Sequence, residues 1–185
     1  MADDFYLSIN VSPRQLSEAE LPLIVSAELH ERAVPARCVA LEMTESVMVD
    51  GSSVTARVLF ELRELGVKLL IDDFGTGFSA LGYLRRFPVT GVKIDRSFVT
   101  GLGVSTEDDE IVRAVVAMSH ALGLDVIAEG VETRLQRDTL AAVGVVHGQG
   151  WLWGPAVPPV EFAAHWHAAG ATALAGQFAD RPVST

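Results

Sequence analysis

Short apolar runs alternate along the chain with longer stretches in which apolar residues recur every three or four positions. The short runs predict buried strands, and the three- and four-residue spacing predicts helices with one apolar face. We expect strands at residues 5–11, 39–43, 67–72, 91–94, 126–128 and 145–147. We expect helices at residues 18–32, 53–65, 79–86, 108–122, 134–143 and 159–168.

This alternation is typical of repeated βα units and predicts an α/β protein with a parallel sheet. Eight units close a TIM-type (β/α) barrel, which typically needs about 250 residues. The 185 residues of this chain supply six units. We therefore expect one domain over residues 1–168 that forms an incomplete TIM-type barrel, with an exposed first strand unless two further units precede it. Residues 169–185 are rich in Ala, Gly, Ser and Pro and predict a flexible C-terminal tail.

The charge balance narrows the possible partners. Asp and Glu number 24 against 14 Lys and Arg, which gives a formal net charge of −10. A nucleic-acid duplex or an anionic membrane surface would require a basic face, so neither is expected as a partner. Cys38 is the single cysteine, no apolar run is long enough to span a membrane, and the acidic start is unlike a secretory signal. We expect a cytoplasmic protein without a membrane segment.

Polar side chains occur at or near the end of every predicted strand. Because the carboxyl ends of parallel strands open on one face, residues far apart in sequence should converge there. A residue that satisfies a turn, or a charged side chain exposed at a strand end, is the alternative at each single position. The six positions are Asn10, Glu42, Asp72, Lys93, Glu129 and Gln149.

Asp72 and Asp73 form a pair of adjacent carboxylates, which repel each other unless a cation lies between them. Taken alone, the pair could equally serve as turn or helix-capping acids. Carboxylate and amide oxygens favour hard cations such as Mg²⁺, Mn²⁺ or Ca²⁺ over zinc. Two such ions, roughly 3.5–4 Å apart, could activate a water and stabilise the oxygens of a phosphodiester. A lysine such as Lys93 could position that water or neutralise the developing charge.

Several motifs together resemble those of the EAL phosphodiesterases, which convert cyclic di-GMP into the linear dinucleotide. The set covers most of the chain in one order and is far more specific than any single tripeptide. The motifs are Asn-Val-Ser at 10–12, Glu-Met-Thr-Glu at 42–45, Asp-Asp-Phe-Gly-Thr-Gly-Phe-Ser at 72–79, Lys-Ile-Asp-Arg-Ser-Phe at 93–98, Ala-Glu-Gly-Val-Glu-Thr at 128–133 and Gln-Gly at 149–150.

The resemblance implies two Mg²⁺ or Mn²⁺ ions, with Ca²⁺ as an inhibitor. It implies that Asn10, Glu42 and Asp72 help to hold one ion, and that Asp72, Asp73 and Glu129 hold the other, so that Asp72 bridges them. The family's function implies cyclic di-GMP as the ligand.

The resemblance also implies roles for residues around the metals. Lys93 would contact the nucleophilic water, and Glu129 and Glu132 belong with it to the catalytic set, with Glu132 anchoring the mobile loop after Asp73. Asp95 and Gln149 would support the pocket. A homodimer, and an upstream GGDEF or sensory domain in the parent protein, are further expectations.

The chain departs from the family at two places. The Glu-Ala-Leu tripeptide that names the family, whose glutamate is a metal ligand, does not occur, and the helical Ser-Glu-Ala-Glu-Leu at 17–21 is no substitute. Near the carboxyl end, Gln-Gly-Trp-Leu-Trp-Gly-Pro-Ala at 149–156 replaces the family's usual basic residue and proline after the glycine. We expect the parent domain to hydrolyse cyclic di-GMP and this chain alone to be weak or inactive. A non-catalytic module that binds cyclic di-GMP or a protein is the alternative, and a fragment unable to fold stably is a third possibility.

Overall fold

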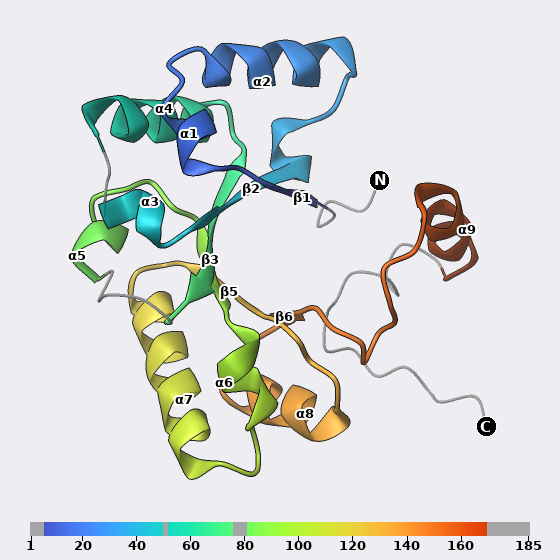
Figure 1. Ribbon diagram of the computed structural model, residues 1–185. Helices are drawn as coiled ribbons and strands as arrows, with labels where there is room; N and C mark the ends of the chain where they lie inside the picture. Colours follow the sequence, from blue (N-terminus) through green and yellow to red (C-terminus); the bar gives the residue numbers. More distant parts are fainter. Residues whose placement is uncertain (1–5, 50–51, 76–80, 170–185) are drawn as a thin grey trace. The chain divides into compact units, whose positions relative to one another are not determined.

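The computed structural model of the protein describes residues 6–49, 52–75 and 81–169 (Figure 1). The strands of this part are β1 (Leu7–Asn10), β2 (Val39–Thr44), β3 (Lys68–Phe74), β4 (Gly91–Ile94), β5 (Asp125–Ala128) and β6 (His147–Gly148). They neighbour one another in chain order within one sheet. The pairs β1–β2, β2–β3 and β5–β6 are parallel. This confirms the predicted α/β class, with six of the eight βα units of a TIM-type barrel.

Helices separate the strands. Their bounds are α1 (Pro13–Leu16), α2 (Leu21–Glu31), the 3₁₀ helix η1 (Ala36–Cys38), α3 (Ser46–Val49), α4 (Ser53–Glu64), α5 (Leu81–Leu84), α6 (Arg96–Thr100), α7 (Thr106–Ala121), α8 (Arg134–Ala142) and α9 (Pro159–Ala169). No helix in the described ranges has the length and apolar character needed to cross a membrane. The tail predicted for residues 169–185 lies outside the described part of the chain, apart from residue 169.

The short helices α1 and α6 were not predicted, because capping side chains rather than apolar spacing define them. Ser12 and Gln15 form a reciprocal capping box at α1, in which each side chain bonds the other residue's backbone. The carboxylate of Asp95 accepts the amide of Ser97 at the start of α6. Four or five residues give no helical period that a sequence pattern could reveal.

Among the predicted boundaries that differ from the observed ones, two differ for clear local reasons. Helix α2 begins at Leu21 rather than at residue 18, because Pro22 suits the first turn of a helix, where its missing amide is not needed. Strand β6 begins at His147 rather than at residue 145, because the amide of Val145 still bonds the carbonyl of Leu140 in α8.

The chain divides into two compact units. The first, here called the amino-terminal unit, comprises Tyr6–Lys93 and Met118–Asp125. In this unit α4 packs against β3, α1 and α2, and Figure 1 shows these three helices together beside β1 and β2. Its core includes fully buried apolar side chains from α1, β2, α4 and β3, namely Leu16, Met43, Val58, Leu59, Leu62, Leu69, Leu70 and Ile71.

Strand β1 stands at one end of the strand order. All four of its residues are exposed, including the apolar Leu7 and Ile9. This agrees with the exposed first strand expected from the six-unit count.

The carboxyl-terminal unit comprises Ile94–Ala117 and the described residues from Val126 onward. Its core contains aliphatic residues of β4, β5, α6, α7, α8 and the segments that connect these elements, namely Ile94, Val99, Leu102, Val112, Val116, Val126, Ile127, Val131, Leu140 and Val145. Each unit therefore carries its own hydrophobic core.

Candidate active site

A buried lysine lies between two carboxylates in the amino-terminal unit. Lys93 on β4 is only 3% exposed, and Glu42 on β2 is 6% exposed. The Nζ atom of Lys93 donates to Oε2 of Glu42 at 2.7 Å and lies 3.0 Å from Oδ1 of Asp72. Removing these charges from water costs several kcal/mol each, and their mutual attraction offsets that cost. The three residues thus form one compensated charge cluster, here called the lysine triad.

Strand register brings the first group of predicted residues to neighbouring positions. Asn10 on β1 lies opposite Glu42 on β2, and the amide of Val11 donates to the carbonyl of Glu42 at 2.8 Å. Asp72 on β3 lies opposite Thr44, two residues beyond Glu42 on β2. Because side chains two residues apart in a strand share a face, Glu42 and Thr44, the residue opposite Asp72, lie on the same face of the sheet. Parallel pairing therefore gathers these predicted residues at one end of the sheet.

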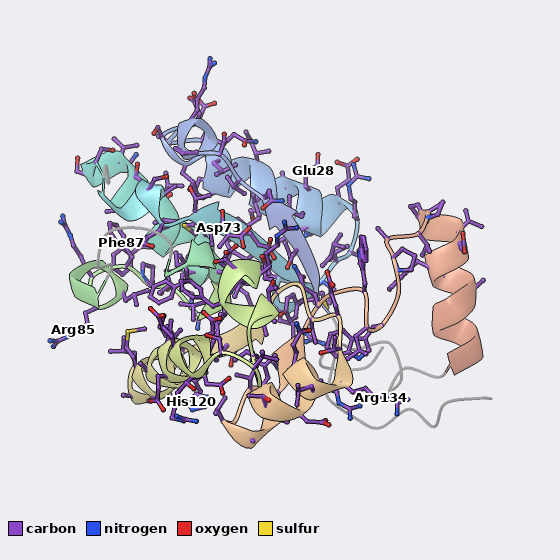
Figure 2. All side chains as sticks on the ribbon, turned by 60° about the horizontal axis from the view of Figure 1, so that its bottom comes forward. Glu28, Asp73, Arg85, Phe87, His120 and Arg134 are labelled. Carbon is purple, nitrogen blue, oxygen red and sulfur yellow. The ribbon has the colours of Figure 1, made fainter. Side chains whose placement is uncertain are left out.

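Asp73 adopts a backbone conformation that few residues other than glycine tolerate. Its φ angle is 53°, and aspartate enters this left-handed region more easily than most residues. The amide of Asp73 donates to Oδ1 of Asp72 at 3.1 Å. A carboxylate oxygen of each residue lies within 4.8 Å of one from the other. Figure 2 shows Asp73 near the end of β3. Two anionic oxygen donors this close fit a hard divalent cation.

Tyr6, Lys68 and Asp125 form a second polar cluster in the same unit, at residues that the sequence pattern did not single out. Lys68 Nζ lies 3.2 Å from Oδ2 of Asp125 and 4.9 Å from the centre of the Tyr6 ring. Burial raises the pKa of Tyr6 above its usual value, and the charges of Asp125 and Glu42 raise it further, with Lys93 opposing them. The available signal was weak: Lys68 and Asp125 are charged residues that open apolar strands.

Glu129 and Gln149 meet in the carboxyl-terminal unit. The amide of Glu129 donates to the carbonyl of Ile94 at 3.1 Å, and the amide of Gln149 donates to the carbonyl of Ala128 at 2.8 Å. These main-chain bonds place both residues just past the ends of neighbouring strands. The side-chain amide of Gln149 then donates to Oε1 of Glu129 at 2.7 Å. One carboxylate oxygen of Glu129 is held by this bond, which orients the group.

A close main-chain approach holds this pair in place. The amide of Val131 donates to the carbonyl of Gln149 at 3.0 Å, and the amide of Leu152 donates to the carbonyl of Val131 at 3.0 Å. A Cβ atom at Gly150 would lie 2.2 Å from the Val131 carbonyl oxygen, and the φ angle of Gly150 is 153°. Only glycine fits at position 150, and this steric requirement explains the glycine of the Gln-Gly motif.

Asp95 caps α6 directly after β4. Burial by itself would raise the pKa of this carboxyl group, but hydrogen bonds from Ser97 and from the amide of Arg96, with the positive charge of Arg96, lower it below its usual value. The resemblance implied that Asp95 supports the pocket, and capping is the contact observed. Glu132 is exposed, and its amide donates to Oε1 of Gln136. Residues 76–80, which include most of the loop that Glu132 was expected to anchor, lie outside the described residues.

The predicted residues thus come together in one set within each unit. The amino-terminal unit holds Asn10, Glu42, Asp72, Asp73 and Lys93, and the carboxyl-terminal unit holds Glu129 and Gln149. These residues carry carboxylate, side-chain amide and ammonium groups. Carboxylate and amide oxygens suit hard cations, and the ammonium group suits anionic oxygens.

Comparison with known proteins gives a family match over most of the chain. Residues 1–156 match the family model described as the EAL domain. The signaling protein YkoW of Bacillus subtilis is 38% identical over 159 residues, which cover 86% of this chain and 20% of YkoW. The bifunctional diguanylate cyclase/cyclic di-GMP phosphodiesterase MucR of Pseudomonas aeruginosa is 37% identical over 155 residues, covering 84% of this chain and 23% of MucR. This chain therefore spans roughly a fifth of the length of such curated relatives.

Solved structures agree with the sequence matches. The EAL domain of Mycobacterium smegmatis DcpA superposes with a TM-score of 0.84 at 40% identity, covering 93% of this chain and 74% of that structure. The MucR phosphodiesterase in complex with cyclic di-GMP superposes with a TM-score of 0.80 at 36% identity, covering 87% of this chain and 65% of that structure.

Proposed function

This chain belongs to the EAL domain family, and we propose that its domain hydrolyses cyclic di-GMP to the linear dinucleotide with the help of divalent metal ions. The observation that carries the proposal is the lysine triad beside the Asp72–Asp73 pair, because it supplies anionic metal ligands and a cation in one place. The solved complex of the MucR phosphodiesterase with cyclic di-GMP supports the choice of substrate.

We propose two Mg²⁺ or Mn²⁺ ions as the cofactors. Asn10, Glu42 and Asp72 would contribute to one ion, and Asp72, Asp73 and Glu129 to the other. Bound metals would lower the pKa of a water and stabilise the attacking and leaving oxygens of the phosphodiester. The oxygen donors fit these ions, and the close approach of Asp72 and Asp73 would be relieved by a cation. Calcium should occupy the site without supporting turnover and thus inhibit.

The remaining site residues would orient the reacting groups. Lys93 would place its ammonium group beside the attacking water and the anionic phosphate, where a fixed positive charge is most effective in a buried setting. Gln149 would hold one oxygen of Glu129 so that the other faces the metal. Glu132 would anchor the loop after Asp73, and Asp95 would fix the start of α6 beside the pocket.

The wider context is also a proposal. We place the domain at residues 1–168, in the cytoplasm, as part of a longer signalling protein that carries an upstream GGDEF or sensory domain. The similarity to MucR, a bifunctional diguanylate cyclase/cyclic di-GMP phosphodiesterase, supports this organisation. A homodimer through the loop and helix after Asp73 would be the assembled form.

A second function is favoured by two departures of the sequence from the family. The sequence contains no Glu-Ala-Leu tripeptide, and the string at 149–156 replaces the family's usual basic residue and proline after the glycine. A site with one ligand fewer should bind metal more weakly, by at least the 10–100-fold that loss of an outer contact costs. We therefore propose that the chain on its own cleaves slowly, and the alternative is a module that binds cyclic di-GMP or a protein without cleaving.

The test is turnover of cyclic di-GMP by this chain, with the linear dinucleotide quantified by chromatography. We expect slow cleavage that requires Mg²⁺ or Mn²⁺ and stops with a chelator or Ca²⁺. Glu129→Gln should lower the rate at least 10-fold, whereas Asp138→Asn, which removes an exposed charge in α8, should not. Metal-independent cleavage, or full activity of Glu129→Gln, would contradict the proposal.

The same assay separates the alternatives. Binding in Ca²⁺ measured by calorimetry, with no product in Mg²⁺ or Mn²⁺, would favour the non-catalytic module. A longer chain that includes upstream sequence should cleave faster. Equal rates for the two chains would refute the weak activity proposed for this one.

A further inference from the structure

Gln136 in α8 is a buried polar residue whose side chain bonds at both ends. It is 7% exposed. Its Oε1 accepts the amides of Glu132 at 2.8 Å and Thr133 at 2.9 Å, which uses both lone pairs of that oxygen. Its Nε2 donates to the carbonyl of Thr100, the last residue of α6, at 3.3 Å. One side chain thus connects the start of α8 to the end of α6, 36 residues earlier in the chain.

The capping half of this arrangement occurs elsewhere in the same protein without the bridge. Ser12 and Gln15 form the same type of box at α1, where Oε1 of Gln15 accepts the amide of Ser12 at 3.0 Å. That box is exposed, and the hydrogen bonds described for Gln15 stay within its own helix end. Capping a helix therefore requires neither the burial of Gln136 nor its contact with Thr100. The bridge has to be explained separately.

The bridge acts on the segment that follows Glu129. Gly130 lies against the first residue of α6, because a Cβ atom there would stand 2.6 Å from Cβ of Arg96. Gln136 holds Glu132 and Thr133 to the last residue of the same helix. The segment from Gly130 to Thr133 therefore contacts both ends of α6, directly at Arg96 and through Gln136 at Thr100, and Glu129 is the residue immediately before it.

We propose that Gln136 is a positioning residue for Glu129, acting through the bridge from α8 to Thr100. This inference rests on the proposed metal role of Glu129. If the bond to Thr100 is lost, the segment after Glu129 can move away from α6, and the carboxylate moves with it. Displacements near 1 Å at a reacting site cost up to about 100-fold, and loss of contacts behind a metal ligand costs about 10–100-fold in metal affinity.

Gln136→Glu separates the bridge from the cap. A carboxylate keeps the oxygen that accepts the amides of Glu132 and Thr133, and places its second oxygen against the Thr100 carbonyl, where two acceptors repel. Gln15→Glu is the matched control, since it makes the same chemical change in the exposed box at α1. We would measure Mn²⁺ affinity by calorimetry, the Tm, the hydrogen exchange of the two capped amides, and the NMR signals of the Gln149 side-chain amide.

For Gln136→Glu we expect Mn²⁺ binding about 10-fold weaker, shifted Gln149 amide signals, and retained protection of the capped amides. Gln15→Glu should change neither the binding nor the Gln149 signals. Unchanged Mn²⁺ affinity and unchanged Gln149 signals in Gln136→Glu would overturn the proposal. If that variant is unfolded at the measuring temperature, Gln136→Met, which has similar length and no charge, removes the bridge together with the cap; Mn²⁺ affinity and Gln149 signals equal to those of the unaltered chain in this variant would overturn the proposal as well.

The two proposals fail in different ways. If the unaltered chain binds no Mn²⁺, the metal function is contradicted, and the Gln149 amide still reports whether Gln136 positions Glu129. If the unaltered chain binds Mn²⁺, and Gln136→Glu binds it equally well with unchanged Gln149 signals, the positioning role is wrong and the metal function stands.

Discussion

Replacing Lys93 with methionine tests the lysine triad most directly. Methionine keeps most of the length and apolar stem of the lysine while it removes the ammonium group. Glu42, which is buried, and Asp72 would then lose the cation that lies 2.7 Å and 3.0 Å from them. We expect a strong loss of stability at neutral pH, because two carboxylates remain in the site without that partner.

The magnitude follows from the geometry. Two unit charges about 3 Å apart attract by roughly 5 kcal/mol at an effective dielectric constant of about 20. The two contacts of Lys93 therefore offset a desolvation cost of several kcal/mol for each buried ion. Removing one partner of a buried pair typically costs about 3–5 kcal/mol. For a domain of this size, each kcal/mol lowers the Tm by about 2–4 °C, so we expect a decrease of about 6–20 °C.

The assay is urea unfolding with the Tm as a second measurement, and the chain offers a matched control. Lys68 also pairs with a carboxylate, Asp125, at 3.2 Å, but their side chains are 34% and 52% exposed. Exposed pairs contribute about 0–1 kcal/mol, and the nearby Tyr6 ring adds about 0.5–1 kcal/mol. Lys68→Met should therefore cost about 0.5–2 kcal/mol.

A double variant tests whether the loss comes from the uncompensated charge. Adding Glu42→Gln to Lys93→Met should recover about 2 kcal/mol, since a neutral amide needs no cation. A loss below about 1 kcal/mol in Lys93→Met, or no recovery in the double variant, would refute the reasoning. The first result would mean that the carboxylates are stabilised by something other than Lys93, and the second that the loss does not come from the uncompensated charge of Glu42.

Three further predictions concern other parts of the site. Asp95→Ala should cost about 1 kcal/mol of stability at pH 7. Because the pKa of Asp95 is lowered in the folded protein, this contribution is present above about pH 4 and is lost as the pH falls through the folded pKa. A cost that stays constant down to about pH 2 in urea unfolding would contradict the prediction. Gly150→Ala should cost about 3 kcal/mol of stability, since the added Cβ meets the Val131 backbone. Each kcal/mol lowers the Tm by about 2–4 °C, so a Tm within about 2 °C of the parent would show that stability does not depend on the close approach of Gly150 to Val131. Mn²⁺ at about 100 times its Kd should stabilise the chain by about 2.7 kcal/mol. Asp73→Asn should weaken this stabilisation, and Asp138→Asn should leave it unchanged. Equal increases in Tm on adding Mn²⁺ to the two variants would argue against a metal at Asp73.

Much of the candidate site was accessible from the sequence because it depends on local pattern. A polar residue that ends an apolar run, such as Glu42 or Glu129, is visible without coordinates, and parallel strands bring such ends to one edge. The order of the motifs identified the family, which the match over residues 1–156 confirmed. The assignment of each residue to a particular metal remains a prediction.

Which side chains touch was decided only by tertiary structure. Lys93 could have paired with several acids. Its pairing with Glu42, 51 residues away in the chain, depends on strand register and on the burial of both side chains. The contact of Gln136 with Thr100 likewise depends on two helices meeting, and no pattern within either helix indicates it.

The amino-acid sequence by itself determined the α/β class, the order of the strands and the polar residues at their ends, because short-range periodicity and chain order govern these features. The tertiary structure alone decided the charge partners of Lys93, the cluster around Tyr6 and the bridge through Gln136. These contacts join residues distant in the chain, and their energies depend on burial and on distances of a few ångströms, which arise only when the packed elements meet.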